Sequence, residues 1–111
     1  MLMKIEVTES FLKSAKKLAK RYRSFNQDYH NLINNLEGNP QLGIDLGGGL
    51  RKIRMAITSK GKGKSGGARV ITFHTIEKGD VLYLVFAYDK SDYDNILLPI
   101  LKELIKDLSL D

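Results

Sequence analysis

The sequence contains no cysteine and no tryptophan, and its 111 residues include only two prolines and two histidines. Without cysteine, the chain cannot form a disulfide framework, bind zinc through thiolates or use a thiol as a nucleophile. No apolar run approaches the roughly 18 residues that a membrane span requires, and residues 1–9 lack the hydrophobic region of a secretory signal. With a length typical of one domain, these absences predict a soluble, cytoplasmic protein with a single domain, residues 1–111, and no membrane partner.

Acidic residues are missing from two stretches of the chain, although the sequence as a whole has 13 acidic and 18 basic residues and a net charge of +5. Six basic residues lie in residues 13–23 and seven in residues 51–69, whereas residues 71–111 contain eight acids and four bases. Such segregation creates a field that attracts a polyanion to one side of a small domain. We therefore expect a nucleic acid or the ribosome as a partner. The alternative is a solvated basic surface without a ligand.

Two amphipathic helices are predicted after a short alternating strand, Lys4–Val7. Thr8 is a suitable N-cap for the first helix, and apolar residues then recur at helical spacing with lysines on the opposite side. This apolar stripe consists of Phe11, Leu12, Ala15, Leu18, Ala19 and Tyr22. A capping-box sequence at residues 24–27 opens the second helix, and Gly38 ends it. The short connection predicts an antiparallel helical hairpin.

Three strands and a last helix are predicted in the second half of the chain. Alternation and β-branched or aromatic residues indicate strands at residues 50–57, 68–76 and 81–88. Loops are expected at residues 41–49 and 58–67, and a hairpin turn at residues 77–80. Apolar spacing indicates a helix over residues 96–108, with Pro99 in its first turn and Asp94 or Asn95 as its cap. The layout is α+β, with the helical hairpin packed on an antiparallel sheet and a C-terminal helix.

Glycine and lysine alternate in the second loop, and residues 61–66 match the pattern G-x-G-x-x-G. In a dinucleotide-binding fold, that pattern follows a strand and opens a helix whose N-terminus holds the pyrophosphate. Here a strand follows, and Thr58 stands where a P-loop requires its first glycine, so neither nucleotide site is expected. The loop is either a flexible solvated hairpin or a segment that binds a phosphate chain through its lysines and N–H groups. We favour the second interpretation.

The residues that remain for chemistry are lysine, arginine and tyrosine. His30 and His74 have no cysteine or acid at ligand spacing, so we expect them to be structural and expect no metal or cofactor. The basic groups suit RNA cleavage by the substrate's own 2′-hydroxyl, which needs in-line orientation, proton transfer and stabilisation of a charged phosphorane. Tyr88 ends a strand, and it is either a functional group or a half-buried ring at the sheet margin.

Three segments carry a resemblance to a known family: GGLRKIR at residues 48–54, SKGKGKSGGARVI at residues 59–71 and YDK at residues 88–90. They resemble the RelE/ParE toxin superfamily, and most closely the HigB-like branch of RelE-type toxins. The resemblance implies an α+β domain with two helices on a curved antiparallel sheet. It also implies an endoribonuclease that cuts mRNA in the ribosomal A site without a metal. The resemblance also implies a second partner for this protein, a cognate antitoxin whose helix-turn-helix domain binds the operator DNA.

The resemblance assigns roles by position. Arg69 matches an arginine that holds the scissile phosphate, and with Arg54 it is expected to stabilise the phosphorane. Lys52 or Lys90 is expected to transfer a proton or neutralise charge, and Tyr88 to stack on or orient a base. The expected catalytic set is therefore Lys52, Arg54, Arg69, Tyr88 and Lys90. The expected RNA or ribosome contacts are Arg51, Lys60, Lys62, Lys64, Lys16 and Lys20.

Two positions depart from RelE itself. RelE has an arginine where this chain has Ser91, and a catalytic tyrosine where this chain has Leu97. Tyr88 and Tyr93 are the candidate substitutes, and the proton-transferring group stays open. The same fold serves ParE-like inhibitors of DNA gyrase that are not nucleases, so gyrase inhibition is the alternative function. An RNA-binding module without activity is a third.

Overall fold

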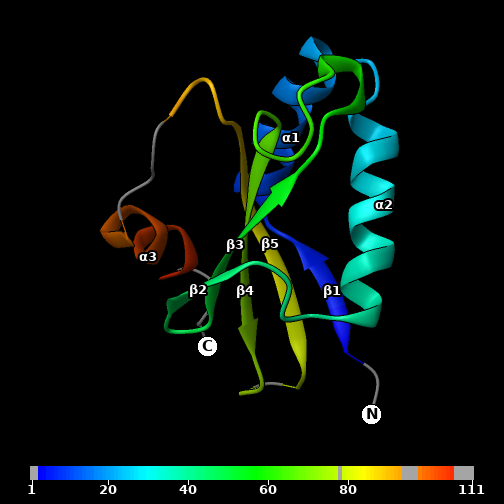
Figure 1. Ribbon diagram of the computed structural model, residues 1–111. Helices are drawn as coiled ribbons and strands as arrows, with labels where there is room; N and C mark the ends of the chain where they lie inside the picture. Colours follow the sequence, from blue (N-terminus) through cyan, green and yellow to red (C-terminus); the bar gives the residue numbers. More distant parts are fainter. Residues whose placement is uncertain (1–2, 78, 94–97, 107–111) are drawn as a thin grey trace.

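The computed structural model describes residues 3–77, 79–93 and 98–106. Within them, a five-stranded sheet lies between two helices on one face and a third helix on the other (Figure 1). The elements, in chain order, are β1 (Lys4–Val7), α1 (Glu9–Arg21), α2 (Phe25–Gly38), β2 (Ile44–Gly47), β3 (Leu50–Met55), the 3-10 helix η1 (Thr58–Lys60), β4 (Ala68–Thr75), β5 (Val81–Asp89) and α3 (Leu98–Lys106). The predicted α+β class is confirmed.

The strand order of the sheet is β1-β5-β4-β3-β2. Strands β2 to β5 form an antiparallel ladder, and β1 adds to β5 in parallel, so the sheet is mixed. The prediction that residues 41–49 form only a loop is wrong, because Ile44 and Asp45 pair with Lys52 and Arg51 as part of β2. This strand is short and bounded by glycines, so no periodic pattern announces it.

Each face of the sheet has its own core. On the first face, α1 and α2 pack over residues that include Ile53, Val70 and Leu84. On the second face, α3 packs through Leu101 over residues that include Leu50, Ile71, Val85 and Tyr88. Strand β5 contributes to both cores, as expected from its nearly unbroken apolar sequence.

Helix α1 is fixed to the edge of β5 by two hydroxyl groups. Thr8 caps the helix as predicted, since its side chain accepts a hydrogen bond from the N–H of Phe11 at 3.1 Å. Ser14 is buried and accepts a hydrogen bond from the N–H of Ala87 at 3.0 Å. Leu12, which we placed in the apolar stripe, is 56% exposed. The buried face of α1 is therefore rotated toward Ser14, because this helix covers a strand edge as well as the sheet face.

The start of α2 also differs from the prediction. The side chain of Ser24 does not cap the helix. Its hydroxyl instead donates to Asp28 at 2.8 Å and lies 2.9 Å from the hydroxyl of Ser59, in η1. The capping-box prediction is therefore wrong. The hydroxyl of Ser24 instead joins the start of α2 to η1 through Ser59, a residue 35 positions further along the sequence.

The last helix begins with Pro99 in its first turn, as predicted. The candidate caps Asp94 and Asn95 lie outside the described residues, as do Leu97 and Leu108. Among the described residues, no helix has the length and apolar character needed to cross a bilayer.

Candidate phosphate-binding site

Three of the predicted site residues are direct neighbours across the strands. Arg54 in β3 is opposite Arg69 in β4, and Arg69 is opposite Tyr88 in β5. Lys52 lies two residues before Arg54 and, because side chains alternate along a strand, shares its face. This face is the one on which α3 packs, since Leu50 and Tyr88 belong to that core. We call Lys52, Arg54, Arg69 and Tyr88 the basic row.

Two positive charges face each other in the basic row. Like charges directly opposite each other destabilise a sheet, and the Arg54–Arg69 pair is such a case. Arg69 is only 5% exposed, whereas Arg54 is exposed. Burial, and next the charge of Arg54, lower the pKa of the Arg69 guanidinium from its ordinary value. An anion bound between the two arginines would relieve this repulsion.

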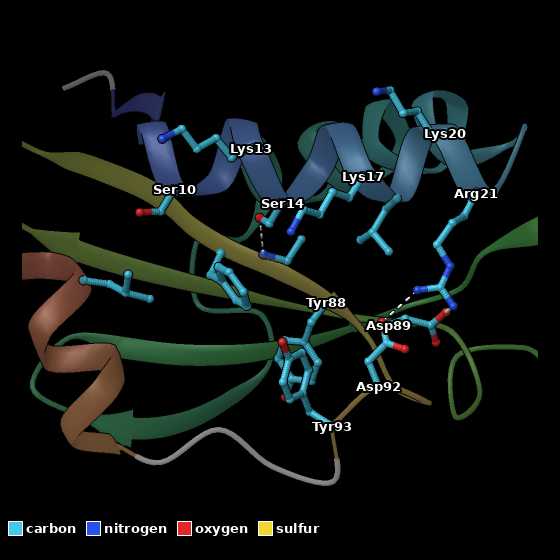
Figure 2. Close-up of a pocket in the computed structure, with 14 residues that line it drawn as sticks. Ser10, Lys13, Ser14, Lys17, Lys20, Arg21, Tyr88, Asp89, Asp92 and Tyr93 are labelled. Carbon is cyan, nitrogen blue, oxygen red and sulfur yellow. Dashed lines mark hydrogen bonds and ion pairs between the residues drawn. The ribbon is translucent and has the colours of Figure 1, made fainter.

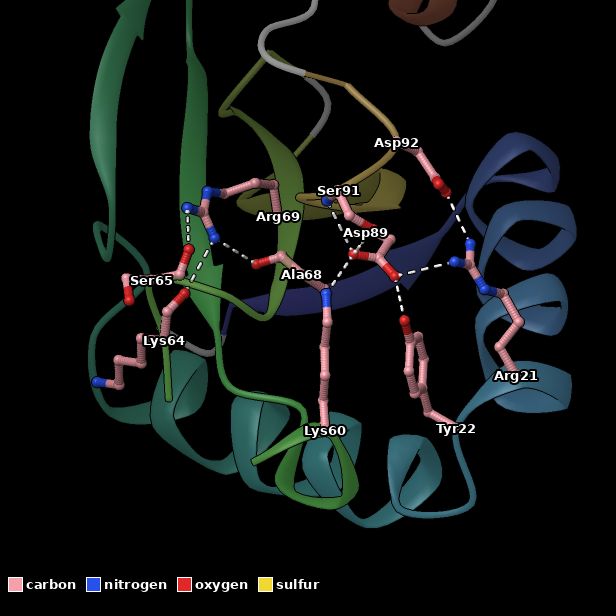
Figure 3. A network of polar contacts seen from close by, with 10 residues as sticks. All are labelled: Arg21, Tyr22, Lys60, Lys64, Ser65, Ala68, Arg69, Asp89, Ser91 and Asp92. Carbon is pink, nitrogen blue, oxygen red and sulfur yellow. Dashed lines mark hydrogen bonds and ion pairs between the residues drawn. The ribbon is translucent and has the colours of Figure 1, made fainter. Parts of the chain in front are cut away.

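The guanidinium of Arg69 is held by the backbone of the glycine–lysine loop (Figure 3). Its Nη1 donates to the carbonyl oxygens of Lys64 at 3.0 Å and Ala68 at 3.2 Å, and its Nη2 donates to that of Ser65 at 3.1 Å. Lys62 and Lys64 are exposed on the same loop. Carbonyl oxygens of the loop thus bind the buried guanidinium of Arg69, and the same loop carries two exposed lysines.

Tyr88 is less accessible than its predicted role requires. It is 4% exposed, and burial raises the pKa of its hydroxyl while the charge of Arg69 opposes that shift. The ring of Tyr93 meets it edge-on, with centroids 5.5 Å apart, and Tyr93 itself is 48% exposed. Of the two rings, Tyr93 is therefore the one that solvent reaches. Of the two interpretations of Tyr88, its low exposure favours that of a buried ring at the sheet margin.

Asp89 organises the end of β5, a role that sequence reasoning missed. Its fully buried carboxylate accepts hydrogen bonds from Lys60 Nζ at 2.7 Å, from the hydroxyl of Tyr22, and from the N–H and hydroxyl of Ser91, each at 2.9 Å (Figure 3). Arg21 Nη2 lies 3.3 Å away. Burial alone would raise the pKa of Asp89, but these hydrogen bonds outweigh it and hold the pKa well below its ordinary value.

Two predicted RNA contacts have other partners in the structure. The ammonium of Lys60 is bound to Asp89 and its side chain is only 14% exposed, so it joins η1 to the end of β5. The guanidinium of Arg51 donates to the carbonyl oxygens of Leu42 at 3.3 Å and Gly43 at 2.9 Å, and Arg51 points to the face opposite the basic row. Both contacts span sequence separations that no local pattern reveals.

The remaining predicted residues are exposed at separate places. Lys90 follows β5, and its N–H donates to the carbonyl oxygen of Gly67 at 3.0 Å, beside the loop that holds Arg69. Lys16 and Lys20 are exposed on α1, and Lys20 lines a groove that Tyr88 of the basic row also lines. The structure therefore gathers Lys52, Arg54 and Arg69 and brings the loop close to them, while the lysines of α1 form a second basic surface.

The histidines lie outside this region. His74 pairs with Asp80 at the opposite end of β4, and the ring of His30 lies 6.1 Å from that of Tyr29 on α2. Within the described part of the chain, no group of three or more histidine, cysteine or acidic side chains is arranged to hold a metal ion.

Comparison with known proteins gives two findings. The sequence model of a family described as the RelE toxin of the RelE/RelB toxin–antitoxin system matches residues 3–106, nearly the whole chain. Among solved structures, the chain is similar to a double arginine-to-alanine mutant of the E. coli toxin RelE in the free state. The TM-score is 0.60 at 14% sequence identity, over 97% of this chain and 99% of that one, so this match concerns the fold. On the family match, the chain belongs to the RelE toxin family.

Proposed function

We propose that this protein is the toxin of a toxin–antitoxin pair and that it cuts mRNA in the ribosomal A site without a metal. The observation that carries the proposal is the pair of arginines placed directly opposite each other on β3 and β4, with Lys52 on the same face. Such a pair weakens the sheet, so we expect the two arginines to bind a group of high negative charge. The phosphorane of an RNA cleavage reaction is such a group.

In the proposed reaction, the 2′-hydroxyl oxygen attacks the adjacent phosphorus and the bond from phosphorus to the 5′-oxygen breaks. One proton leaves the 2′-hydroxyl and one reaches the departing 5′-oxygen, which gives a 2′,3′-cyclic phosphate and a 5′-hydroxyl. Three of the five N–H groups of Arg69 donate to carbonyl oxygens. The other two suit a forked contact with phosphate oxygens, and Arg54 adds a second positive charge.

The remaining roles follow from position. Lys52 beside the arginines and Lys90 beside the loop are the proposed groups for proton transfer or charge neutralisation. Lys62 and Lys64 are proposed to bind the RNA backbone next to the scissile phosphate, and the α1 lysines Lys16 and Lys20 to contact the ribosome. Lys60 and Arg51 are left out of this set because their charged groups are bound within the fold.

The proposal includes a protein partner. Membership of a toxin–antitoxin family supports a cognate antitoxin that neutralises this chain. We further propose that the antitoxin carries a helix-turn-helix domain and that the toxin reaches operator DNA only through it. Within the superfamily, the HigB-like branch stays a prediction from the sequence.

The test is inducible expression with growth measurement and mapping of transcript 5′ ends. Wild-type protein is expected to stop growth and to produce new 5′ ends within codons, whereas Arg69→Ala and Arg54→Gln are expected to do neither. Arg23→Gln, which changes an exposed arginine in the turn after α1, is the matched control and keeps activity. Growth arrest with intact transcripts and a DNA damage response would contradict the proposal and support gyrase inhibition.

A further inference from the structure

A groove of about 600 Å³ lies between α1, the last part of β5 and α3 (Figure 2). It exists because β1 is short. The pairing of β1 with β5 ends at Val7 and Leu84, so residues 85–89 have no strand beside them on that edge. Helix α1 covers this edge instead, through Thr8 to the carbonyl oxygen of Val85 and Ser14 to the N–H of Ala87.

The floor of the groove is aromatic. Phe86, Tyr88 and Tyr93 line it, with Phe86 and Tyr88 ring centroids 6.2 Å apart and Tyr88 and Tyr93 centroids 5.5 Å apart. Tyr93 is the exposed member of this group, at 48%. The structure therefore leaves the Tyr93 ring open to solvent, packed against Tyr88, which in turn packs against Phe86.

The rim of the groove is basic. Lys13, Lys17 and Lys20 line it from α1. The two acids that also line it are already paired: Asp89 is held by Lys60 and its other donors, and Asp92 pairs at 2.7 Å with Arg21, a fourth basic residue of the lining. Glu9 pairs with Lys13 at 3.2 Å, but no acid of the described residues pairs with Lys17. The charge presented to a ligand is therefore positive.

Aromatic floor and basic rim together match single-stranded nucleic acid. Bases stack on aromatic rings, and the phosphates between them are attracted by lysines. An apolar peptide would use the floor and leave the lysines without partners, so it fits the groove less well. The groove also continues the basic row, since Tyr88 lines it and is the cross-strand neighbour of Arg69. Adjacent strands lie about 4.8 Å apart, so the Tyr88 part of the groove lies directly beside the strand that carries Arg69.

We propose that this groove is a nucleotide subsite for the RNA substrate, in which Tyr93 stacks on a base next to the scissile phosphate and Lys17 binds the phosphate of that nucleotide. The subsite rests on the proposed function, because it assumes that the strand crossing the basic row is RNA. The proposed function gives proton transfer to Lys52 or Lys90, so we assign Lys17 and Tyr93 to positioning the substrate.

The experiment measures binding of a short single-stranded RNA with a 2′-O-methyl group at each sugar, which prevents cleavage, by fluorescence anisotropy at several salt concentrations. Tyr93→Leu is expected to weaken binding about 5- to 150-fold, the range for one lost base–aromatic stack. Tyr93→Phe keeps the ring and is expected to bind like wild type. Lys17→Gln is expected to reduce the slope of log affinity against log salt by about 0.7, as for one lost phosphate contact.

Lys4→Gln is the control, since Lys4 is exposed on β1 and does not line the groove. Equal binding by Tyr93→Leu, Lys17→Gln and Lys4→Gln would overturn the subsite, as would failure of the wild-type protein to bind the RNA at low salt. The second probe is an oligoglutamate peptide with the same charge as the RNA. If Tyr93→Leu weakened binding of this peptide as much as binding of the RNA, base stacking on Tyr93 would be overturned. Cleavage by wild type on ribosomes is measured in parallel, so that its absence counts against the proposed function alone.

Discussion

Replacing Asp89 with asparagine is expected to destabilise the fold far more than the same change at a surface ion pair. The substitution keeps the shape of the side chain but removes a fully buried negative charge that Lys60 binds at 2.7 Å. Breaking a buried ion pair from one side costs about 3–5 kcal/mol, because the other charge is left without its partner. A domain of this size has a free energy of unfolding of about 5–15 kcal/mol, so a large part of it would be lost.

Thermal unfolding followed by circular dichroism measures this loss. At about 4 °C per kcal/mol for a chain of this length, the expected decrease in Tm is roughly 12–20 °C. Asp92→Asn is the matched control, because Asp92 pairs with Arg21 at the surface, where the two side chains are 43% and 46% exposed. A surface pair contributes about 0–1 kcal/mol. If the free energies of unfolding of Asp89→Asn and Asp92→Asn differed by less than 1 kcal/mol, the assignment of Asp89 as the organiser of this region would be refuted.

The same carboxylate gives a pH dependence with a definite sign. The pKa of Asp89 is lowered in the folded state, so its stabilising contribution is fully present above the unfolded pKa of about 3.9. That contribution is lost as the pH falls from there through the folded pKa. The free energy of unfolding, measured by urea at several pH values, is expected to fall below pH 4 more steeply for wild type than for Asp89→Asn. Parallel curves would contradict the interpretation.

Three further substitutions test the cap of α1, the conformation of the loop at Gly67 and the repulsion between Arg54 and Arg69. Thr8→Ala removes the cap of α1 and is expected to cost about 1 kcal/mol in urea unfolding; an unchanged midpoint would count against the cap. Gly67→Ala would place a Cβ 2.2 Å from the carbonyl oxygen of Met55, so we expect a strongly lowered Tm, and a wild-type Tm would show that the loop has another conformation. Arg54→Gln removes the repulsion with Arg69 and is expected to raise stability by about 0.2–1 kcal/mol while lowering cleavage. A loss of stability would mean that the pair is not strained.

The sequence predicted one part of the basic row, the shared face of Lys52 and Arg54, because strand alternation is a local rule. Once residues 50–57 are recognised as a strand, Lys52 and Arg54 must share a face. The pairing that puts Arg69 opposite Arg54 was not predicted from the sequence and comes from the structure. The roles of these residues came from family resemblance and remain proposals.

The sequence could not predict contacts that depend on distant partners. Lys60 looks like any other lysine of the loop, and only the fold places it against Asp89, 29 residues further on. The burial of Tyr88 depends on α3 and Tyr93, which no pattern around Tyr88 reveals. Leu12 fits the helical stripe by spacing, yet the edge of β5 turns Ser14 inward in its place.

Single-turnover cleavage of mRNA on purified ribosomes shows whether the opposed arginines stabilise the phosphorane of an RNA cleavage reaction. Loss of one preorganised charge contact to a transition state lowers the rate about 10²- to 10³-fold. We expect Arg69→Ala, shown to be folded by circular dichroism, to cleave slower by at least this factor, with Arg23→Gln at the wild-type rate. Cleavage by folded Arg69→Ala at the wild-type rate would contradict it.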